Sequence, residues 1–152
     1  MTTATTTKLE AVNVMMTSIG ETPVNTITAA TTTDVAIAIT ILDNVSREVQ
    51  SVGWHFNIDQ DYQLIPNSSN QIELPSNCLR IDTSGASANS DYVERARKLW
   101  DRKKHTYTLT DEIVYVDIVW FLDFTEIPEA AKRYITIRAA RLFQDRMLAS
   151  DL

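Results

Sequence analysis

The stretch Val49-Gln-Ser-Val-Gly-Trp-His-Phe-Asn57 marks the point where the residue pattern of this chain changes from helical to extended. Before it, apolar residues recur every three or four positions, as they do along one face of an α-helix. The spacing predicts a helix over residues 34–52. Gly53 follows directly, and we expect it to take a positive φ as the helix C-cap, with Trp54 buried against the helical core. The apolar positions are Val35, Ala38, Ile39, Leu42, Val45, Val49 and Val52.

Two isoleucines of this helix, Ile37 and Ile41, lie off the main apolar stripe. The helix is therefore apolar on more than one side, which a surface helix with a single buried face would not be. Two interpretations are open. The helix lies in the middle of a small bundle, or its second face is covered by a neighbouring subunit.

Helical spacing recurs near both ends of the chain. Apolar residues predict a helix over 8–19, with Gly20 at the position of a C-cap and Pro23 in the turn that follows. A last helix is predicted over 128–149, where Pro128 suits the first turn.

Between the second and last helices, apolar and polar residues alternate in short runs separated by Pro, Asn and Ser, as strands and turns do. The run at 113–124, which is β-branched and aromatic, is the strongest strand candidate. The element order predicts an α+β fold, with a small bundle of three main helices and a strand-rich insert over about 59–124. A chain of 152 residues suits a single domain.

Composition excludes several classes of protein. The formal charge of −6 argues against generic nucleic-acid binding, which depends on an excess of Lys and Arg. No apolar stretch reaches the roughly 18 uninterrupted residues of a membrane span. Residues 1–7 are threonine-rich and lack the basic and apolar regions of a secretory signal, so we expect a soluble protein that is not secreted by that route. Cys78 is the one cysteine, and we expect a buried, inert thiol.

The residues that catalysis needs are sparse. His55 and His105 are the two histidines, and no His-x-x-x-His pair accompanies the one cysteine. Three glycines in the whole chain leave no Gly-x-Gly-x-x-Gly fingerprint or phosphate-binding loop. We therefore expect no enzyme activity, no cofactor and no metal site.

One dense basic run stands out, with six Lys or Arg residues between positions 95 and 104, around Leu99 and Trp100. It is either a contact surface for nucleic acid or for an acidic protein, or the solvated face of a hairpin whose Trp100 packs inward. Arginine and tryptophan are enriched at interface hot spots, which favours a subunit or partner contact over nucleic acid. The candidate contact residues here are Arg95, Arg97, Lys98 and Trp100.

Several stretches of the chain resemble one family. Ala11-Val-Asn-Val-Met-Met-Thr-Ser-Ile-Gly-Glu-Thr-Pro-Val24 and the segment 41–57, which closes in Gln-Ser-Val-Gly-Trp-His-Phe-Asn, are similar to two signatures of the tail tubular protein A family of short-tailed phages. Leu99-Trp-Asp-Arg102, residues 119–124 and Ile127-Pro-Glu-Ala-Ala-Lys-Arg-Tyr-Ile-Thr-Ile-Arg-Ala-Ala-Arg-Leu-Phe-Gln144 follow in the same order and spacing. The resemblance covers nearly the whole chain after Lys8.

The resemblance implies a structural virion protein, the head-to-tail adaptor or gatekeeper. Twelve copies would form a homo-oligomeric ring under the portal protein, with the tail nozzle (tail tubular protein B) and fibres attached below it. DNA would pass through the channel without specific binding, and no membrane would be involved. The rival hypothesis is an oligomeric protein-binding module without a virion role. Family members usually continue past the last helix into an acidic segment that grips the portal, whereas this sequence ends at Leu152; either it docks differently or a tail follows.

An adaptor ring needs surfaces for its neighbours and a channel that repels DNA. We expect apolar side chains to be exposed at the edges of the helices and an excess of negative charge to line the channel. The candidates for subunit contact are Ile37, Ile41, Ile137 and Phe143, and those for the channel are Asp82, Asp91, Asp111 and Glu112.

Overall fold

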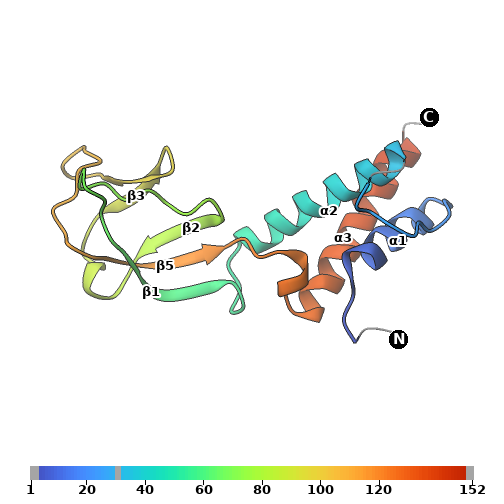
Figure 1. The fold of residues 1–152 in the computed structure, drawn as a ribbon, viewed down its shortest axis with the longest axis horizontal. Helices are drawn as coiled ribbons and strands as arrows, with labels where there is room; N and C mark the ends of the chain where they lie inside the picture. Colours follow the sequence, from blue (N-terminus) through green and yellow to red (C-terminus); the bar gives the residue numbers. More distant parts are fainter. Residues whose placement is uncertain (1–3, 30–31, 150–152) are drawn as a thin grey trace. The chain divides into compact units, whose positions relative to one another are not determined.

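The computed structural model describes residues 4–29 and 32–149. The chain folds into two compact units (Figure 1). The helical unit comprises residues up to 49 and from 122 onward, and the strand unit comprises residues 50–121. The α+β class predicted from the sequence is confirmed, since the strands all lie between the second and third helices.

The described residues form three α-helices, α1 (Lys8–Ser18), α2 (Thr33–Ser51) and α3 (Glu129–Leu148). Each bound lies within one residue of the helices predicted over 8–19, 34–52 and 128–149. α1 begins with a capping box, in which the Thr7 side chain and Glu10 satisfy each other's backbone N–H groups. Pro128 is the N-cap of α3 rather than part of its first turn.

α1 ends as its glycine predicts. Gly20 has a φ of +82°, its N–H donates to the Thr17 carbonyl, and the N–H of Glu21 donates to the Met16 carbonyl. This pair of bonds is a Schellman motif, which needs a residue in the left-handed region just after the helix. The prediction of a C-cap at Gly20 is confirmed.

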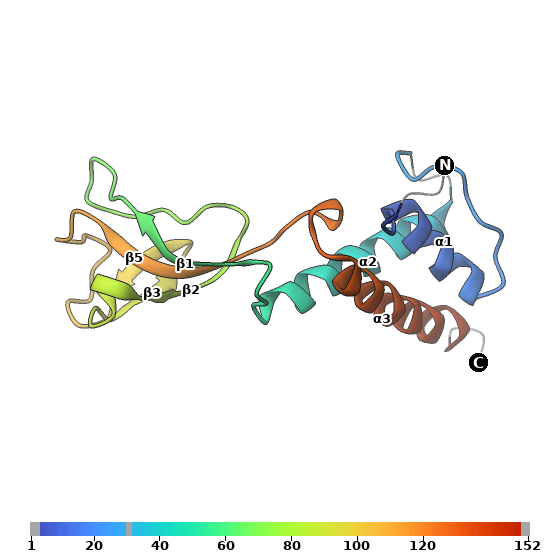
Figure 2. The ribbon, with the colours of Figure 1, turned by 90° about the horizontal axis from the view of Figure 1, so that it is seen from below.

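The helical unit has a core built from one face of each helix. Two ion pairs join the helices around this core: Lys8 of α1 lies 2.8 Å from Asp43 of α2, and Arg138 of α3 lies 2.6 Å from Glu48 of α2. Figure 2 shows the three helices side by side within this unit. The buried side chains include Val12 and Met15 of α1, Val35, Ala38, Leu42 and Val45 of α2, and Ile135, Ala139 and Phe143 of α3.

The strand unit contains a three-stranded antiparallel sheet in the order β1-β5-β2, made of β1 (Ile58–Leu64), β5 (Val114–Trp120) and β2 (Cys78–Thr83). A hairpin of β3 (Tyr92–Arg95) and β4 (Lys98–Asp101) forms a second, two-stranded sheet. β5 is the central strand, and it falls within the run that the sequence marked as the strongest strand candidate.

The alternation of side chains along β5 shows which residues lie on which face of the sheet. Val114, Val116 and Ile118 are fully buried in the core of the strand unit. Leu99 of β4 joins the same core, so the hairpin covers this inner face at least in part. Because successive side chains of a strand point to opposite sides, Tyr115, Asp117 and Val119 lie on the outer face.

Candidate assembly surfaces

The turn that follows α2 is fixed by two residues, Gly53 and Asn57. Gly53 has a φ of +84°, which confirms the predicted C-cap, and its N–H donates to the Gln50 carbonyl. A Cβ at this position would lie 2.8 Å from Nη2 of Arg80 and 3.1 Å from Cγ2 of Val119. The turn therefore requires glycine for its backbone conformation and for its close packing.

Asn57 is the residue that the sequence analysis missed. It is 1% exposed, and its Nδ2 donates to the carbonyls of Gln50 (2.8 Å) and Trp120 (2.9 Å). Its Oδ1 accepts the backbone N–H of Trp54 at 2.7 Å. One buried amide thus joins the end of α2, the turn and the end of β5. Its place in the motif was visible in the sequence, but its bond to the Trp120 carbonyl joins it to a segment distant along the chain.

The predicted burial of Trp54 is wrong, because its side chain is 43% exposed. The buried position in this turn is taken by the short amide of Asn57, which both donates to the Gln50 carbonyl and accepts the Trp54 backbone N–H, whereas an indole can only donate. Trp54 is therefore part of the surface of the strand unit.

The outward face of α3 carries most of the exposed apolar residues of the helical unit. Tyr134, Ile137 and Leu148 are 54%, 47% and 48% exposed; Tyr134 and Ile137 adjoin on one helix face, and exposed Arg141 and Asp145 separate them from Leu148. Leu142, 45% exposed, lines an open groove between α2 and α3 together with Ile41 and Arg146. Ile137 is thus exposed as expected.

Two of the expected apolar contacts are not on the surface. Phe143 is fully buried in the helical core, and Ile41 is only 7% exposed, so the prediction of exposure is wrong for both. Phe143 lies on the side of α3 that packs against the other helices, and Ile41 is covered at the floor of the α2–α3 groove. Ile37 is half-buried and lines a second hollow beside Arg146.

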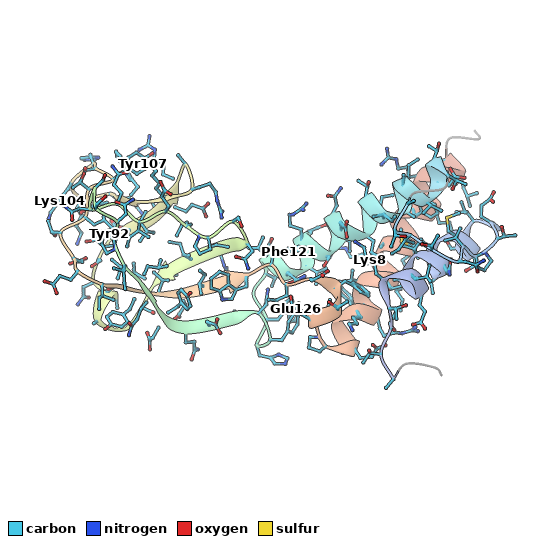
Figure 3. All side chains as sticks on the ribbon, in the orientation of Figure 1. Lys8, Tyr92, Lys104, Tyr107, Phe121 and Glu126 are labelled. Carbon is cyan, nitrogen blue, oxygen red and sulfur yellow. The ribbon has the colours of Figure 1, made fainter. Side chains whose placement is uncertain are left out.

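The hairpin surface, which we define as Arg95, Lys98, Trp100 and Tyr107, combines cations with aromatic rings. Cζ of Arg95 lies 4.5 Å from the centre of the Trp100 ring, and the Trp100 and Tyr107 ring centres are 4.6 Å apart at 71°. Nζ of Lys98 lies 5.9 Å from the Tyr107 ring centre. Trp100 alternates with the fully buried Leu99, so it points away from the core and is only half-buried. Figure 3 shows Tyr92, Lys104 and Tyr107 at the end of the strand unit that carries this hairpin.

Arg97 does not belong to this surface, although the sequence grouped it there. Its guanidinium donates to the carbonyls of Cys78 and Pro75 and to the Glu94 carboxylate. Arg97 and its neighbour Ala96 both have positive φ, 61° and 53°, in the two-residue turn between β3 and β4. A two-residue turn with positive φ at both positions matches the twist of the flanking strands. Residues other than glycine adopt this φ at a cost in free energy. The contacts of Arg97 hold this turn against the 75–78 segment.

We expect Arg97→Ala to lower the free energy of unfolding by about 1–2 kcal/mol, because three charge-assisted hydrogen bonds are lost while the strained turn remains. Arg95→Ala is the matched control, since it removes the same group from an exposed cation–π contact worth less than about 1 kcal/mol. Urea denaturation followed by tryptophan fluorescence would measure both. Equal destabilisation by the two variants would contradict the structural role of Arg97.

The acidic residues expected to line a channel do not form one cluster. Asp91 lies 3.5 Å from Arg102, and Asp111 accepts a hydrogen bond from the Tyr92 hydroxyl. Burial of the Tyr92 hydroxyl and this hydrogen bond raise its pKa to about 12. Glu112 is exposed in the loop before β5.

Asp82 instead lies on the outer face of the sheet, directly opposite Asp117 in the β2–β5 register. The backbone N–H of Asp61 donates to Oδ1 of Asp117 at 3.1 Å, and the Asp61 carboxylate itself accepts from the Ser84 hydroxyl. We call Asp61, Asp82 and Asp117 the sheet surface. Arg80 is the cation of this face, and its Nη2 donates to the Val52 carbonyl at 2.9 Å.

The residues considered for chemistry are dispersed. His55 and His105 are both exposed, and Cys78 is buried, with burial raising the pKa of its thiol. Among the described residues, no group of three or more His, Cys, Asp or Glu side chains could hold a metal ion. In the same part of the chain, no helix is long and apolar enough to cross a membrane.

The described residues build surfaces suited to contact with other proteins: an apolar helix face, a cationic aromatic hairpin and an acidic sheet face. Such surfaces are of the kind through which proteins assemble. The model of the tail tubular protein family matches residues 9–152, and the chain belongs to this family. It is a structural protein of a phage tail. No curated protein sequence gives a significant match to the chain.

Proposed function

We propose that this tail tubular protein is the head-to-tail adaptor, with twelve copies in a ring between the portal and the tail nozzle. The family supports a place in the virion tail, and the resemblance to the A subfamily supports the adaptor position. In this proposal the two compact units act together as one adaptor domain, and the ring encloses the path of the outgoing DNA.

The observation that carries the proposal is the exposed apolar face of α3. Exposed apolar side chains that adjoin on one helix face, as Tyr134 and Ile137 do, are candidates for a protein contact. Tyr134 and Ile137 are each about half exposed, and Leu142 borders the neighbouring groove. We assign this face to the contact between adjacent copies. The contact is head-to-tail, because a two-fold contact closes at a dimer and leaves no channel.

The charge of the chain supports a channel role. Each copy carries a formal −6, so a ring of copies presents many negative charges to a polyanion. Negative charge facing the channel repels phosphate and prevents DNA from adhering to the wall. The tail nozzle and the portal would occupy the two open faces of the ring.

The test is assembly of the purified protein, alone and with a portal ring, observed by negative-stain electron microscopy and mass photometry. We expect rings of twelve copies on the portal. Ile137→Glu should weaken ring formation at least tenfold, since it places a charge in an apolar contact. Ile65→Glu is the matched control, because Ile65 is 69% exposed in a loop of the strand unit, whereas α3 belongs to the helical unit.

Two outcomes would contradict the proposal. A wild-type protein that forms a closed dimer and ignores the portal would favour an oligomeric binding module without a virion role. Rings that tolerate Ile137→Glu as well as Ile65→Glu would remove α3 from the contact. Circular dichroism of each variant would show whether a loss of assembly reflects a loss of fold.

A further inference from the structure

The hairpin surface carries cations that the chain itself does not neutralise. Arg95 stacks on Trp100, and Nζ of Lys98 donates to the side-chain oxygen of Gln71 at 3.0 Å. Within the part of the chain that the structure describes, neither cation forms an ion pair, although Glu73 is a cross-strand neighbour of Lys98. Arg97 and Arg102 differ, since each lies next to a carboxylate of its own hairpin region.

The aromatic rings give this surface a fixed shape. Trp100 and Tyr107 meet edge to face, and Arg95 lies over the indole. A guanidinium held on a ring keeps its N–H donors directed outward in a narrow range of orientations. The surface is therefore preorganised to bind carboxylates, which lowers the entropy cost of association.

The sheet surface has the complementary charge. Asp82 and Asp117 are directly opposite each other on adjacent strands, an arrangement of like charges that destabilises a sheet. The Asp61 backbone N–H reaches Asp117, and the Ser84 hydroxyl lies 2.8 Å from the Asp61 carboxylate. Arg80 borders the same hollow as Asp82 and Asp117, its Nη2 donates to the Val52 carbonyl, and it is one cation beside the carboxylates of this surface. An approaching cation would relieve the repulsion between the two opposed carboxylates.

The two surfaces lie on different sides of one core. Leu99 of the hairpin and Ile118 of the sheet are both fully buried in this core. Trp100 alternates with Leu99, and Asp117 alternates with Ile118, so each surface points away from the core. Within one copy the two surfaces cannot meet, whereas a contact between copies can bring them together.

We propose that, in the ring of the proposed function, the hairpin surface of one copy binds the sheet surface of the next copy. Two different surfaces of opposite charge on different sides of one unit make a heterologous contact, which can repeat around a rotation axis. This contact supplements the apolar contact at α3. It also makes neighbouring copies face the same way around the ring, because two hairpin surfaces, or two sheet surfaces, would repel each other.

Charge reversal tests this contact. The hairpin variant is Arg95→Glu/Lys98→Glu, and the sheet variant is Asp82→Lys/Asp117→Lys. Each double variant by itself should self-associate at least tenfold more weakly than the wild-type protein, as measured by sedimentation velocity at low salt. Mixed in equal amounts, the two variants should associate again in alternation, and a chain with all four changes should associate with itself. The wild-type contact should weaken as salt rises, because charges near the surface are screened.

The matched control is Lys103→Glu/Lys104→Glu, which makes the same change in net charge in the exposed turn next to the hairpin surface. It should weaken association less than the hairpin variant. Equal effects of the two would mean that net charge, rather than this surface, controls assembly, and would overturn the inference.

Failure of this inference is distinguishable from failure of the proposed function. If wild-type protein forms rings on the portal and the reversed variants form them equally well, the hairpin–sheet contact is wrong and the adaptor function stands. If the hairpin variant loses only the binding of a labelled oligonucleotide, the surface contacts nucleic acid and the inference is overturned. If wild-type protein forms no ring, the proposed function itself fails, and the inference fails with it.

Discussion

Asn57→Leu is expected to destabilise the strand unit by about 3 kcal/mol. The substitution removes the side-chain donor to the carbonyls of Gln50 and Trp120 and the acceptor of the Trp54 N–H, while the Gln50 carbonyl keeps the N–H of Gly53. A buried polar group that loses its partner costs about 1–3 kcal/mol, and here the Trp120 carbonyl and the Trp54 N–H each lose one. Leucine branches at the same carbon as asparagine and has as many side-chain heavy atoms, so the effect is mainly one of unsatisfied hydrogen bonds.

Urea denaturation followed by circular dichroism would measure the change. Asn57→Asp separates the role of the amide oxygen from that of the amide nitrogen. It keeps an oxygen that can accept the Trp54 N–H, and it removes the Nδ2 donors. It also buries a charge, so we expect it to be at least as destabilising as Asn57→Leu. Asn89→Ala is the control, since Asn89 is exposed in the same unit. A change within about 0.5 kcal/mol for Asn57→Leu would show that water can replace the amide.

Gly53→Ala is expected to cost about 2–3 kcal/mol. An L-residue in the left-handed region costs about 1–2 kcal/mol. At this position the added Cβ would also lie 3.1 Å from Cγ2 of Val119 and 3.2 Å from Cδ1 of Ile58. It would press further on the Arg80 guanidinium, at 2.8 Å, and threaten the bond of that guanidinium to the Val52 carbonyl.

Gly20→Ala supplies the matched comparison. Gly20 has nearly the same φ, +82° against +84°, but nothing lies within 4 Å of a Cβ placed there. It should therefore report the backbone cost alone, about 1 kcal/mol, and the difference between the two variants measures the packing around Gly53. Thermal unfolding of both variants in one buffer would make the comparison. Equal losses of stability would mean that the neighbours of Gly53 move aside freely.

Most of the helical architecture could be predicted from the sequence. The α2 stripe, with a glycine where it stops, is a local pattern, because helical periodicity and C-capping involve residues within four or five positions of each other. For the same reason Gly20 and Gly53 could be identified as positions of positive φ. The strand-rich insert was recognisable from alternation, although its strand order, with β5 at the centre, was not.

The contact surfaces could be predicted only in part. The exposed position of Ile137 and the basic hairpin with Arg95 and Lys98 followed from the pattern. The pattern did not separate Arg97, whose guanidinium binds carbonyls about twenty positions earlier in the chain. The outer position of Asp82 opposite Asp117 depends on a strand register that local sequence does not encode.

The sequence by itself determined which residues form helices, where two of the helices end and that an extended insert separates the second from the last. Only the tertiary structure decided which side chains are buried. Phe143 and Ile41 are covered by neighbouring helices, Trp54 is exposed, and Asn57 occupies the buried position in the turn. The physical reason is that periodicity gives the angle of a residue around its own axis, whereas burial depends on which distant segment packs there.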